Sequence, residues 1–195
     1  MHTILIAGIL AVVPTNMEMA EDALVMALEE LPAQLAALGA SEVNVEVSGE
    51  HTGNWFIKQT VLSVLHESGI TVTDWTDPED PSMVLRIRPM ELSVDYGGVS
   101  RPWIVGNKRV ERIAKCELMS TLLDGDGEIL FNLRTSGLRQ DVVSWSETEL
   151  LEGSTEWEWL SGELPQNSGG GILEPIVVTG VVASLVYLFY SSRAE

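Results

Sequence analysis

The feature that most constrains this chain is an apolar run near its C-terminal end. The residues from Ile172 to Tyr190 include a single charge, Glu174, which falls in the first turn of the expected helix. About 20 apolar residues, each rising 1.5 Å, cross the roughly 30 Å hydrocarbon core of a bilayer. We therefore predict a transmembrane helix over residues 172–190, the alternative being a helix buried in a protein core. Gly180 and Ser184 are small and four residues apart, which favours close packing against another membrane helix.

The short tail after this run, residues 191–195, contains Arg193 as its basic residue. Lysine and arginine next to a membrane span favour the cytoplasmic side. We therefore expect the C-terminus in the cytoplasm and the rest of the chain on the opposite side of the membrane.

The N-terminal residues 1–19 contain a shorter apolar run, from Ile4 to Val13. It is too short to span a bilayer and fits the hydrophobic region of a signal peptide. The alternatives are a retained hydrophobic segment, or the first strand or helix of the domain. With a signal peptide, the chain is a single-pass inner-membrane protein whose domain lies in the periplasm. Without one, it is a tail-anchored adaptor with a cytosolic domain.

The charge of the chain excludes some classes of partner. The formal net charge is −18, from 29 acidic and 11 basic residues. Nucleic-acid binding needs a dominant basic face to neutralise phosphates, so no nucleic-acid partner is expected. An anionic bilayer surface is an unfavourable partner for the domain as a whole for the same reason. The lone cysteine, Cys116, forms no internal disulfide and is expected to be buried as a small apolar side chain.

Residues 20–160 have the patterns of one folded domain. Residues 20–39 repeat leucine at helical spacing, and Pro32 should kink this helix or split it in two. Residues 42–48 alternate valine with polar residues, which predicts a half-buried strand. A second amphipathic helix is predicted over residues 55–68, followed by a short strand over residues 70–75.

Longer strands are predicted in the second half of the domain, over residues 83–96, 110–123 and 128–136. Pro89 removes a backbone donor and therefore predicts a bulge or an edge position within the first of them. The sequence Asp-Gly-Asp-Gly at residues 124–127 is typical of a hairpin turn. These strands therefore predict a three-stranded antiparallel meander.

The remainder of the domain reads as a short helix or an extended arm over residues 141–160, followed by a flexible linker over residues 161–171. The predicted fold class is α+β: helix, strand, helix, strand, then the antiparallel three-stranded meander, plus one C-terminal transmembrane helix. Trp145, Trp157 and Trp159 form an aromatic group that we expect to pack on the sheet, or else to rest at the membrane interface.

This order of elements, with HESGITV closing the second helix, LRIR in a strand and DGDG in a hairpin, resembles bacterial envelope accessory domains. These are the auxiliary lipoproteins of transport and surface-assembly systems, including those of curli, flagellar outer-membrane parts and lipopolysaccharide delivery. The resemblance covers residues 20–140 and is topological. It implies a non-catalytic envelope role with other envelope proteins as partners. The chain departs from these proteins because they usually carry an N-terminal lipid-bearing cysteine, where this one has a C-terminal apolar run.

The sequence contains no motif that predicts catalysis. It lacks the nucleophile elbow, the phosphate-binding loop, the dinucleotide fingerprint and the zinc-protease motif. We therefore expect neither enzymatic activity, nor a cofactor, nor a small-molecule ligand. The alternative is a hydrolase whose carboxylates come from distant parts of the chain. Asp124, Asp126 and Glu128 resemble part of a calcium loop, but apolar strands flank them directly, which favours a hairpin turn over a metal site.

Most of the 11 basic residues lie between Arg86 and Lys115. One interpretation is that these bases pair with acids on neighbouring strands. The other concerns the segment between the first two long strands, which contains Arg101, Pro102, Trp103, Ile104 and Val105. Apolar and arginine side chains together are typical of a surface that contacts a partner. We therefore predict that this loop is a contact tip for another protein or a lipid headgroup.

Overall fold

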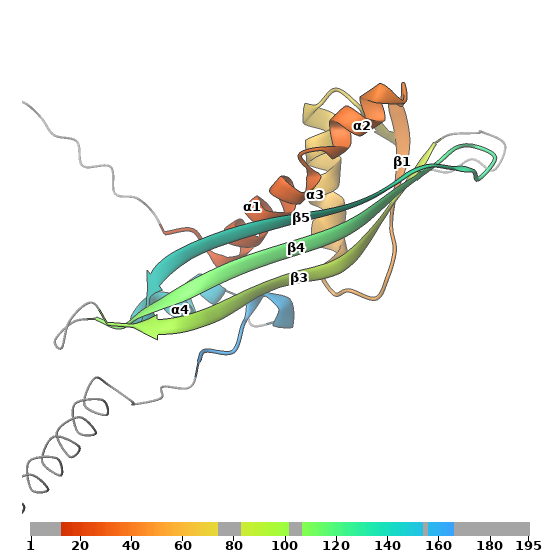
Figure 1. The fold of residues 1–195 in the computed structure, drawn as a ribbon. Coiled ribbons are helices and arrows are strands. Elements are labelled where there is room, and N and C mark those ends of the chain that lie inside the picture. The colour runs from red at the N-terminus through yellow and green to blue at the C-terminus, as the bar shows by residue number, and fades with distance from the viewer. Residues whose placement is uncertain (1–12, 74–82, 102–106, 154–155, 166–195) are drawn as a thin grey trace, which may run out of the picture. The chain divides into compact units, whose positions relative to one another are not determined.

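The computed structural model describes residues 13–73, 83–101, 107–153 and 156–165 (Figure 1). In this part of the chain the elements are, in order, α1 (Asn16–Leu28), α2 (Leu31–Ala37), β1 (Glu42–Val47), α3 (Asn54–Glu67), β2 (Thr71–Thr73), β3 (Val84–Ser100), β4 (Arg109–Leu123), β5 (Ile129–Ser144), η1 (Trp145–Glu147), α4 (Thr148–Glu152) and η2 (Glu158–Leu160). The α+β class is therefore confirmed.

The first helix begins four residues earlier than predicted, at Asn16 rather than at residue 20. Thr15 and Glu18 form a capping box: the Glu18 backbone N–H donates to the Thr15 hydroxyl, and the Thr15 backbone N–H donates to the Glu18 carboxylate. This arrangement satisfies backbone donors that the first turn of a helix leaves free. Pro32 lies in the first turn of α2, where proline is tolerated, so the predicted split into two helices is confirmed.

The five strands form one mixed sheet with the order β2-β1-β3-β4-β5. The predicted antiparallel meander is confirmed as β3, β4 and β5. The register of β3 against β4 shifts between Pro89 and Glu91, which confirms the predicted irregularity at the proline. β1 pairs in parallel with both β2 and β3, a pairing on which the sequence patterns made no prediction. One feature differs from the prediction: β5 continues to Ser144, past its predicted end at Ser136.

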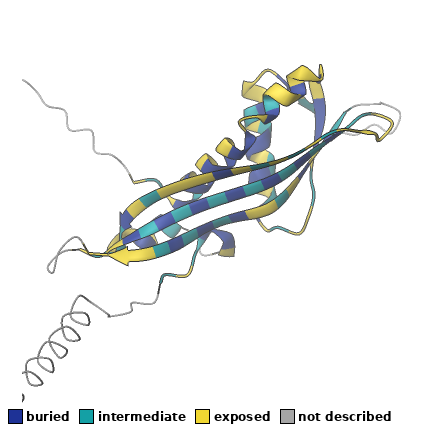
Figure 2. Ribbon diagram, in the orientation of Figure 1, coloured by how far each residue is buried: buried dark blue, intermediate teal, exposed yellow. Residues whose placement is uncertain are grey.

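The helices pack on one face of the sheet, and that interface holds the main core. Burial alternates along β4, so every second residue points into the core (Figure 2). Cys116 is one of these inward residues, as predicted. Burial raises the pKa of its thiol to about 12, with Glu117 and Glu91 adding to the effect, so the thiolate that would react is scarce at neutral pH.

The core also needs one glycine. A Cβ atom added at Gly137 of β5 would lie 1.9 Å from the backbone oxygen of Ala23 in α1. The helix therefore rests directly on the backbone of β5, an approach that only glycine permits.

The C-terminal part of the folded unit contains a short helix, α4, within the range predicted as a short helix or an extended arm, but it differs from the predicted linker. The chain leaves β5 through η1 and α4, and η2 then returns to β3. Residues 161–165, the first part of the predicted linker, lie on the folded unit, where a Cβ added at Gly162 would be 2.6 Å from the Val94 oxygen. The compact unit ends at Pro165.

The predicted transmembrane segment, with Gly180 and Ser184, lies outside the described residues, as does the predicted leader up to residue 12. Within the part of the chain that the structure describes, no helix has the length and apolar character needed to cross a bilayer.

Candidate functional site

A buried polar network lies at the end of the sheet where β5 ends and α1 begins. Its centre is Arg112 of β4, whose side chain is 0% exposed. Its guanidinium donates to the Asp141 carboxylate on β5 through Nε at 3.1 Å and through Nη2 at 2.7 Å. It also donates through Nη1 to Asn16 Oδ1 at 2.8 Å and through Nη2 to the Pro14 carbonyl at 2.8 Å. Arg112 therefore joins two strands to the start of α1.

Asn16 extends the network to the C-terminal part of the folded unit. Its side-chain nitrogen donates to the Leu160 carbonyl at 2.6 Å and to the Tyr96 hydroxyl at 3.1 Å. Burial raises the pKa of Tyr96, and the hydrogen bond with Asn16 opposes this shift. Burial also raises the pKa of the nearby Glu152 carboxyl, against the effect of its hydrogen bond with Tyr96. Groups from α1, β3, β4, β5, α4 and η2 thus meet in one place.

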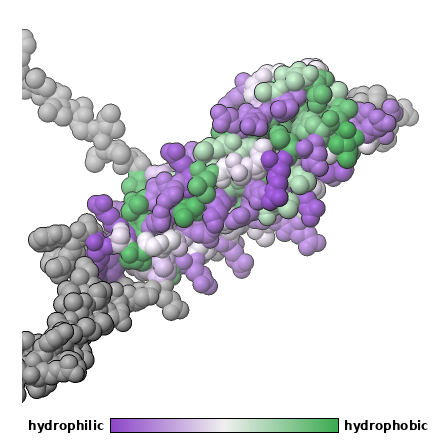
Figure 3. Space-filling view, viewed as in Figure 1, coloured by the Kyte–Doolittle hydropathy of each residue, from purple (hydrophilic) through white to green (hydrophobic). Residues whose placement is uncertain are grey.

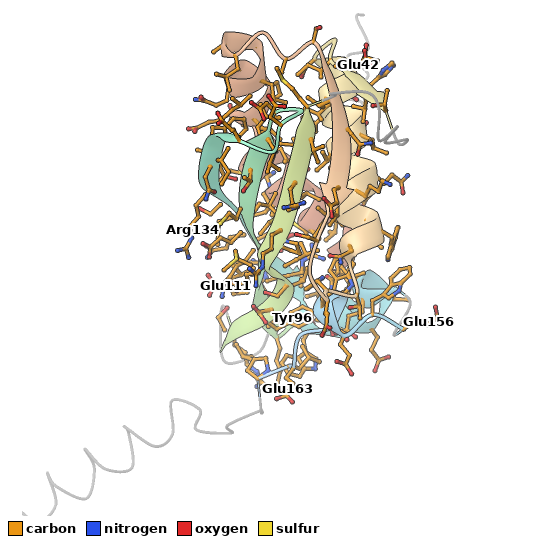
Figure 4. The ribbon with its side chains drawn as sticks, turned by 90° about the vertical axis from the view of Figure 1, so that its right-hand side faces the viewer. Glu42, Tyr96, Glu111, Arg134, Glu156 and Glu163 are labelled. Atoms are coloured by element: carbon orange, nitrogen blue, oxygen red, sulfur yellow. The ribbon has the colours of Figure 1, made fainter. Side chains whose placement is uncertain are left out.

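The network brings the two described ends of the folded unit together. Pro14 is bonded to Arg112, and Leu164 packs beside a small apolar cluster formed by Tyr96, Val110, Val143 and Leu151. Figure 4 shows Tyr96 and Glu163 toward one end of the molecule and Glu42 toward the other. The chain therefore enters and leaves the folded unit at the same end of the sheet.

The predicted contact tip begins at this end. Ser100 and Arg109 are the last paired residues of β3 and β4, so the chain leaves β3 and enters β4 at this end of the sheet. Arg101 and Arg109 are exposed, and the Lys108 ammonium lies 5.4 Å from the centre of the Trp145 ring. The other predicted tip residues, Pro102, Trp103, Ile104 and Val105, lie outside the described residues.

Several other bases pair with acids on neighbouring elements, as one of the two interpretations predicted. The pairs are Arg86 with Glu46, Lys115 with Glu91 and Asp95, Arg134 with Glu117, and Arg139 with Asp22. All these bases are at least 42% exposed, so each pair stabilises the fold only slightly. Arg112 differs from them because its side chain is fully buried.

Asp124, Asp126 and Glu128 form a turn. Asp124 Oδ1 accepts hydrogen bonds from the backbone N–H groups of Asp126 at 3.0 Å and Glu128 at 2.8 Å. This confirms the predicted hairpin turn. The described residues contain no group of three or more histidine, cysteine or acidic residues placed to hold a metal ion.

The predicted tryptophan group divides into two sites. Trp159 is buried against Phe56, with the ring centres 5.4 Å apart, and Trp157 packs against Trp55 with tilted rings whose centres are 5.1 Å apart. Trp145 lies instead beside Lys108. Trp55 also borders an open groove of about 380 Å³ between α3 and β1.

The Arg112 network was not predicted from the sequence. Side chains alternate between the two faces of a strand, so Arg112 lies on the same face as Val110 and Ala114, which are both fully buried. That alternation was the available signal for a buried arginine. Its partner Asp141 lay in a segment predicted as helix or arm, so the pair was not foreseen.

The sequence matches no protein-family model and no curated protein. The fold distantly resembles bacterial lipoproteins of known structure. A minor lipoprotein from Acinetobacter baumannii has a TM-score of 0.37 and 14% identity, with 57% of this chain and 77% of that chain covered. A neuraminyllactose-binding hemagglutinin homolog from Helicobacter pylori has a TM-score of 0.34 and 13% identity, covering 53% and 67%. Uncharacterized lipoprotein B from Nitrosomonas europaea has a TM-score of 0.34 and 14% identity, covering 58% and 72%.

Proposed function

We propose that this chain is a membrane-anchored, non-enzymatic accessory or scaffold domain of a bacterial envelope assembly or transport complex. In this proposal the apolar segment Ile172–Tyr190 is a single inner-membrane span. The folded unit lies in the periplasm and the short tail after the span lies in the cytoplasm. The domain acts by holding a partner protein close to the membrane.

The observation that carries the proposal is the convergence of the two described chain ends on the Arg112 network. Seven residue steps separate Pro165 from Ile172, which reach at most roughly 25 Å when extended. A span that begins there would keep this end of the sheet near the bilayer surface. The predicted contact tip begins at Arg101, at the same end of the sheet, so its partner would be an integral membrane protein or one bound close to the membrane.

The chemistry of the tip supports a protein partner. Arg101 and Arg109 are exposed, and the intervening sequence contains Pro102, Trp103, Ile104 and Val105. Tryptophan and arginine contribute strongly to protein interfaces because each combines a large contact area with a polar group. The neighbouring α4 carries Glu149 and Glu152, so this end of the domain is not uniformly basic. A lipid surface alone therefore fits it less well than a protein of mixed charge.

The test replaces Arg101 and Trp103 together with alanine in the full chain, followed by cross-linking and purification from membranes. The expected result is loss of co-purifying envelope proteins with no change in the amount of folded chain. The matched control replaces Arg134 and Trp55, an exposed arginine and an exposed tryptophan on other parts of the domain. Unchanged recovery of partners from the Arg101/Trp103 variant would remove the tip from the proposal.

A further inference from the structure

β5 is a long strand at the edge of the sheet. It has 16 residues, and in the described part of the chain its strand neighbour is β4 alone. The other edge strand, β2, has only three residues. A long edge strand presents a row of backbone donors and acceptors that another strand can pair with.

The second half of β5 carries exposed apolar side chains. Leu138 is 53% exposed and Val142 is 57% exposed, and both lie on the sheet face opposite the helices. Figure 3 shows hydrophobic atoms among hydrophilic ones over this part of the sheet. This half contains no proline, which is one of the residues that commonly prevent pairing at a sheet edge.

α1 lies differently against the two halves of the edge strand β5. Asn16, the first residue of α1, contacts Tyr96 of β3 and Arg112 of β4. The middle of α1 lies instead on Gly137 of β5. The helix therefore crosses the sheet obliquely, and its later turns extend past the first half of β5 toward α2 (Figure 1). Among the described residues, no strand pairs with the outer edge of the half from Ser136 to Ser144.

We propose that residues 136–144 of β5 pair antiparallel with the same residues of a second copy of this chain, with the two-fold axis at Gln140. Antiparallel pairing of identical strands is self-complementary and closes as a dimer. In this register Leu138 faces Val142 of the other copy, and Arg139 faces Asp141 of the other copy. Each of these pairs occurs twice.

Charge complementarity supports this register, and it supports a second copy of this chain as the partner that pairs with β5. Residues that face each other on neighbouring strands point to the same side of the sheet. In a two-fold antiparallel pair of identical strands, the axis therefore passes through a residue that faces its own copy, because an axis between two residues would pair side chains that point to opposite sides. An axis at Arg139 or at Asp141 would place two like charges opposite each other, which is unfavourable. The axis at Gln140 instead pairs opposite charges on one face and apolar side chains on the other.

The same register places Asp141, and therefore the Arg112 network, beside the axis. The two described ends of the folded unit in one copy then lie close to those in the other copy. This inference does not rest on the proposed envelope role, because a dimer would form with or without a further partner.

The test is disulfide cross-linking of the full chain in membranes. Cysteine replaces Gln140, which in the dimer lies opposite its own copy at a Cα separation of about 4.5–5.5 Å, within the range of a disulfide. The expected result is oxidation of most of the chain to a species of twice the monomer mass. The control, Asn132→Cys, places an exposed residue of the same strand eight positions from the axis, so it should form no covalent dimer. The wild-type chain should also form no covalent dimer, because Cys116 is buried.

A second measurement uses charge. Arg139→Glu places one acid opposite Asp141 of the other copy in each of the two symmetric pairs. It should weaken dimerisation by about tenfold, since both pairs then bring like charges together. Arg134→Glu should leave the dimer unchanged, because its facing position, residue 146, is past the end of β5. Three results would overturn the proposal: a Gln140→Cys chain that forms no covalent dimer, equal cross-linking of Asn132→Cys, or cross-linking of Gln140→Cys to a different protein only.

Discussion

Arg112 and Asp141 join two neighbouring strands by a two-point ion pair in which the arginine is fully buried and the aspartate is 27% exposed. The same guanidinium also donates to Asn16 and to the Pro14 carbonyl, so each of its three nitrogens donates at least one hydrogen bond. A buried charge is tolerated when its hydrogen bonds are satisfied in this way. Arg112 therefore fixes where the N-terminal part of the chain joins the sheet.

Replacing Arg112 with methionine should strongly destabilise the folded unit. The change leaves Asp141 and the buried Asn16 without their donor, and breaking such a pair typically costs about 3–5 kcal/mol. Arg109→Met, at an exposed position of the same strand, should change stability by less than about 0.5 kcal/mol. The free energy of unfolding of the full chain in mild detergent, followed by tryptophan fluorescence in urea, checks both. Equal stability of the two variants would show that the network is not structural.

Replacing Gly137 with alanine should also destabilise the fold, for a steric reason. The added methyl group would lie 1.9 Å from the Ala23 oxygen, so α1 must move away from β5. Overpacking of this kind costs about 1–3 kcal/mol or more. Gly98→Ala is the matched control, because nothing lies within 4 Å of the added atom. The same urea titration distinguishes them, and a neutral Gly137→Ala would contradict the packing described above.

Trp159 should tolerate phenylalanine better than alanine. Its ring packs on Phe56 at 5.4 Å, and its buried indole N–H has no hydrogen-bond partner among the described residues. Truncation to alanine leaves a cavity that costs about 3–5 kcal/mol. Phenylalanine keeps most of the packing and loses no hydrogen bond, so its loss of stability should be clearly smaller. Thermal unfolding by circular dichroism measures both, and equal losses would contradict this interpretation.

The stability of the wild-type chain should depend on Glu152 in a defined direction. Burial raises the pKa of this carboxyl above its ordinary value of 4.5 in the folded state. The folded state therefore binds more protons than the unfolded state between 4.5 and the raised pKa, so this group lowers stability as pH rises through that window. Glu152→Gln should match the wild type below pH 4.5 and be more stable at pH 7. Urea midpoints at the two pH values test this, and a variant less stable at pH 7 would contradict it.

Local patterns in the sequence predicted most individual elements. The alternation around Val43 to Val47, the helix closed at Gly69 and the turn at Asp124 are determined by residues close together in the chain. The split at Pro32 and the register shift after Pro89 follow from the missing backbone donor of proline. These features need no knowledge of tertiary contacts.

Features that depend on distant contacts were not predictable in this way. The parallel pairing of β1 with β3 brings Val45 beside Leu85, 40 residues further along the chain. The extension of β5 to Ser144 depends on its pairing with β4 down to Arg109. The candidate site depends on the same pairing, because Arg112 contacts Asp141 only when β4 and β5 pair in this register.

The measurement that tests the central claim most directly is the accessibility of the folded unit to protease. Intact cells are compared with cells whose outer membrane is permeabilised and with cells whose inner membrane is also lysed. The proposed envelope role predicts digestion once the outer membrane is permeabilised, with a membrane-associated C-terminal fragment left behind. Protection until the inner membrane is lysed would place the domain in the cytosol and contradict the role proposed here.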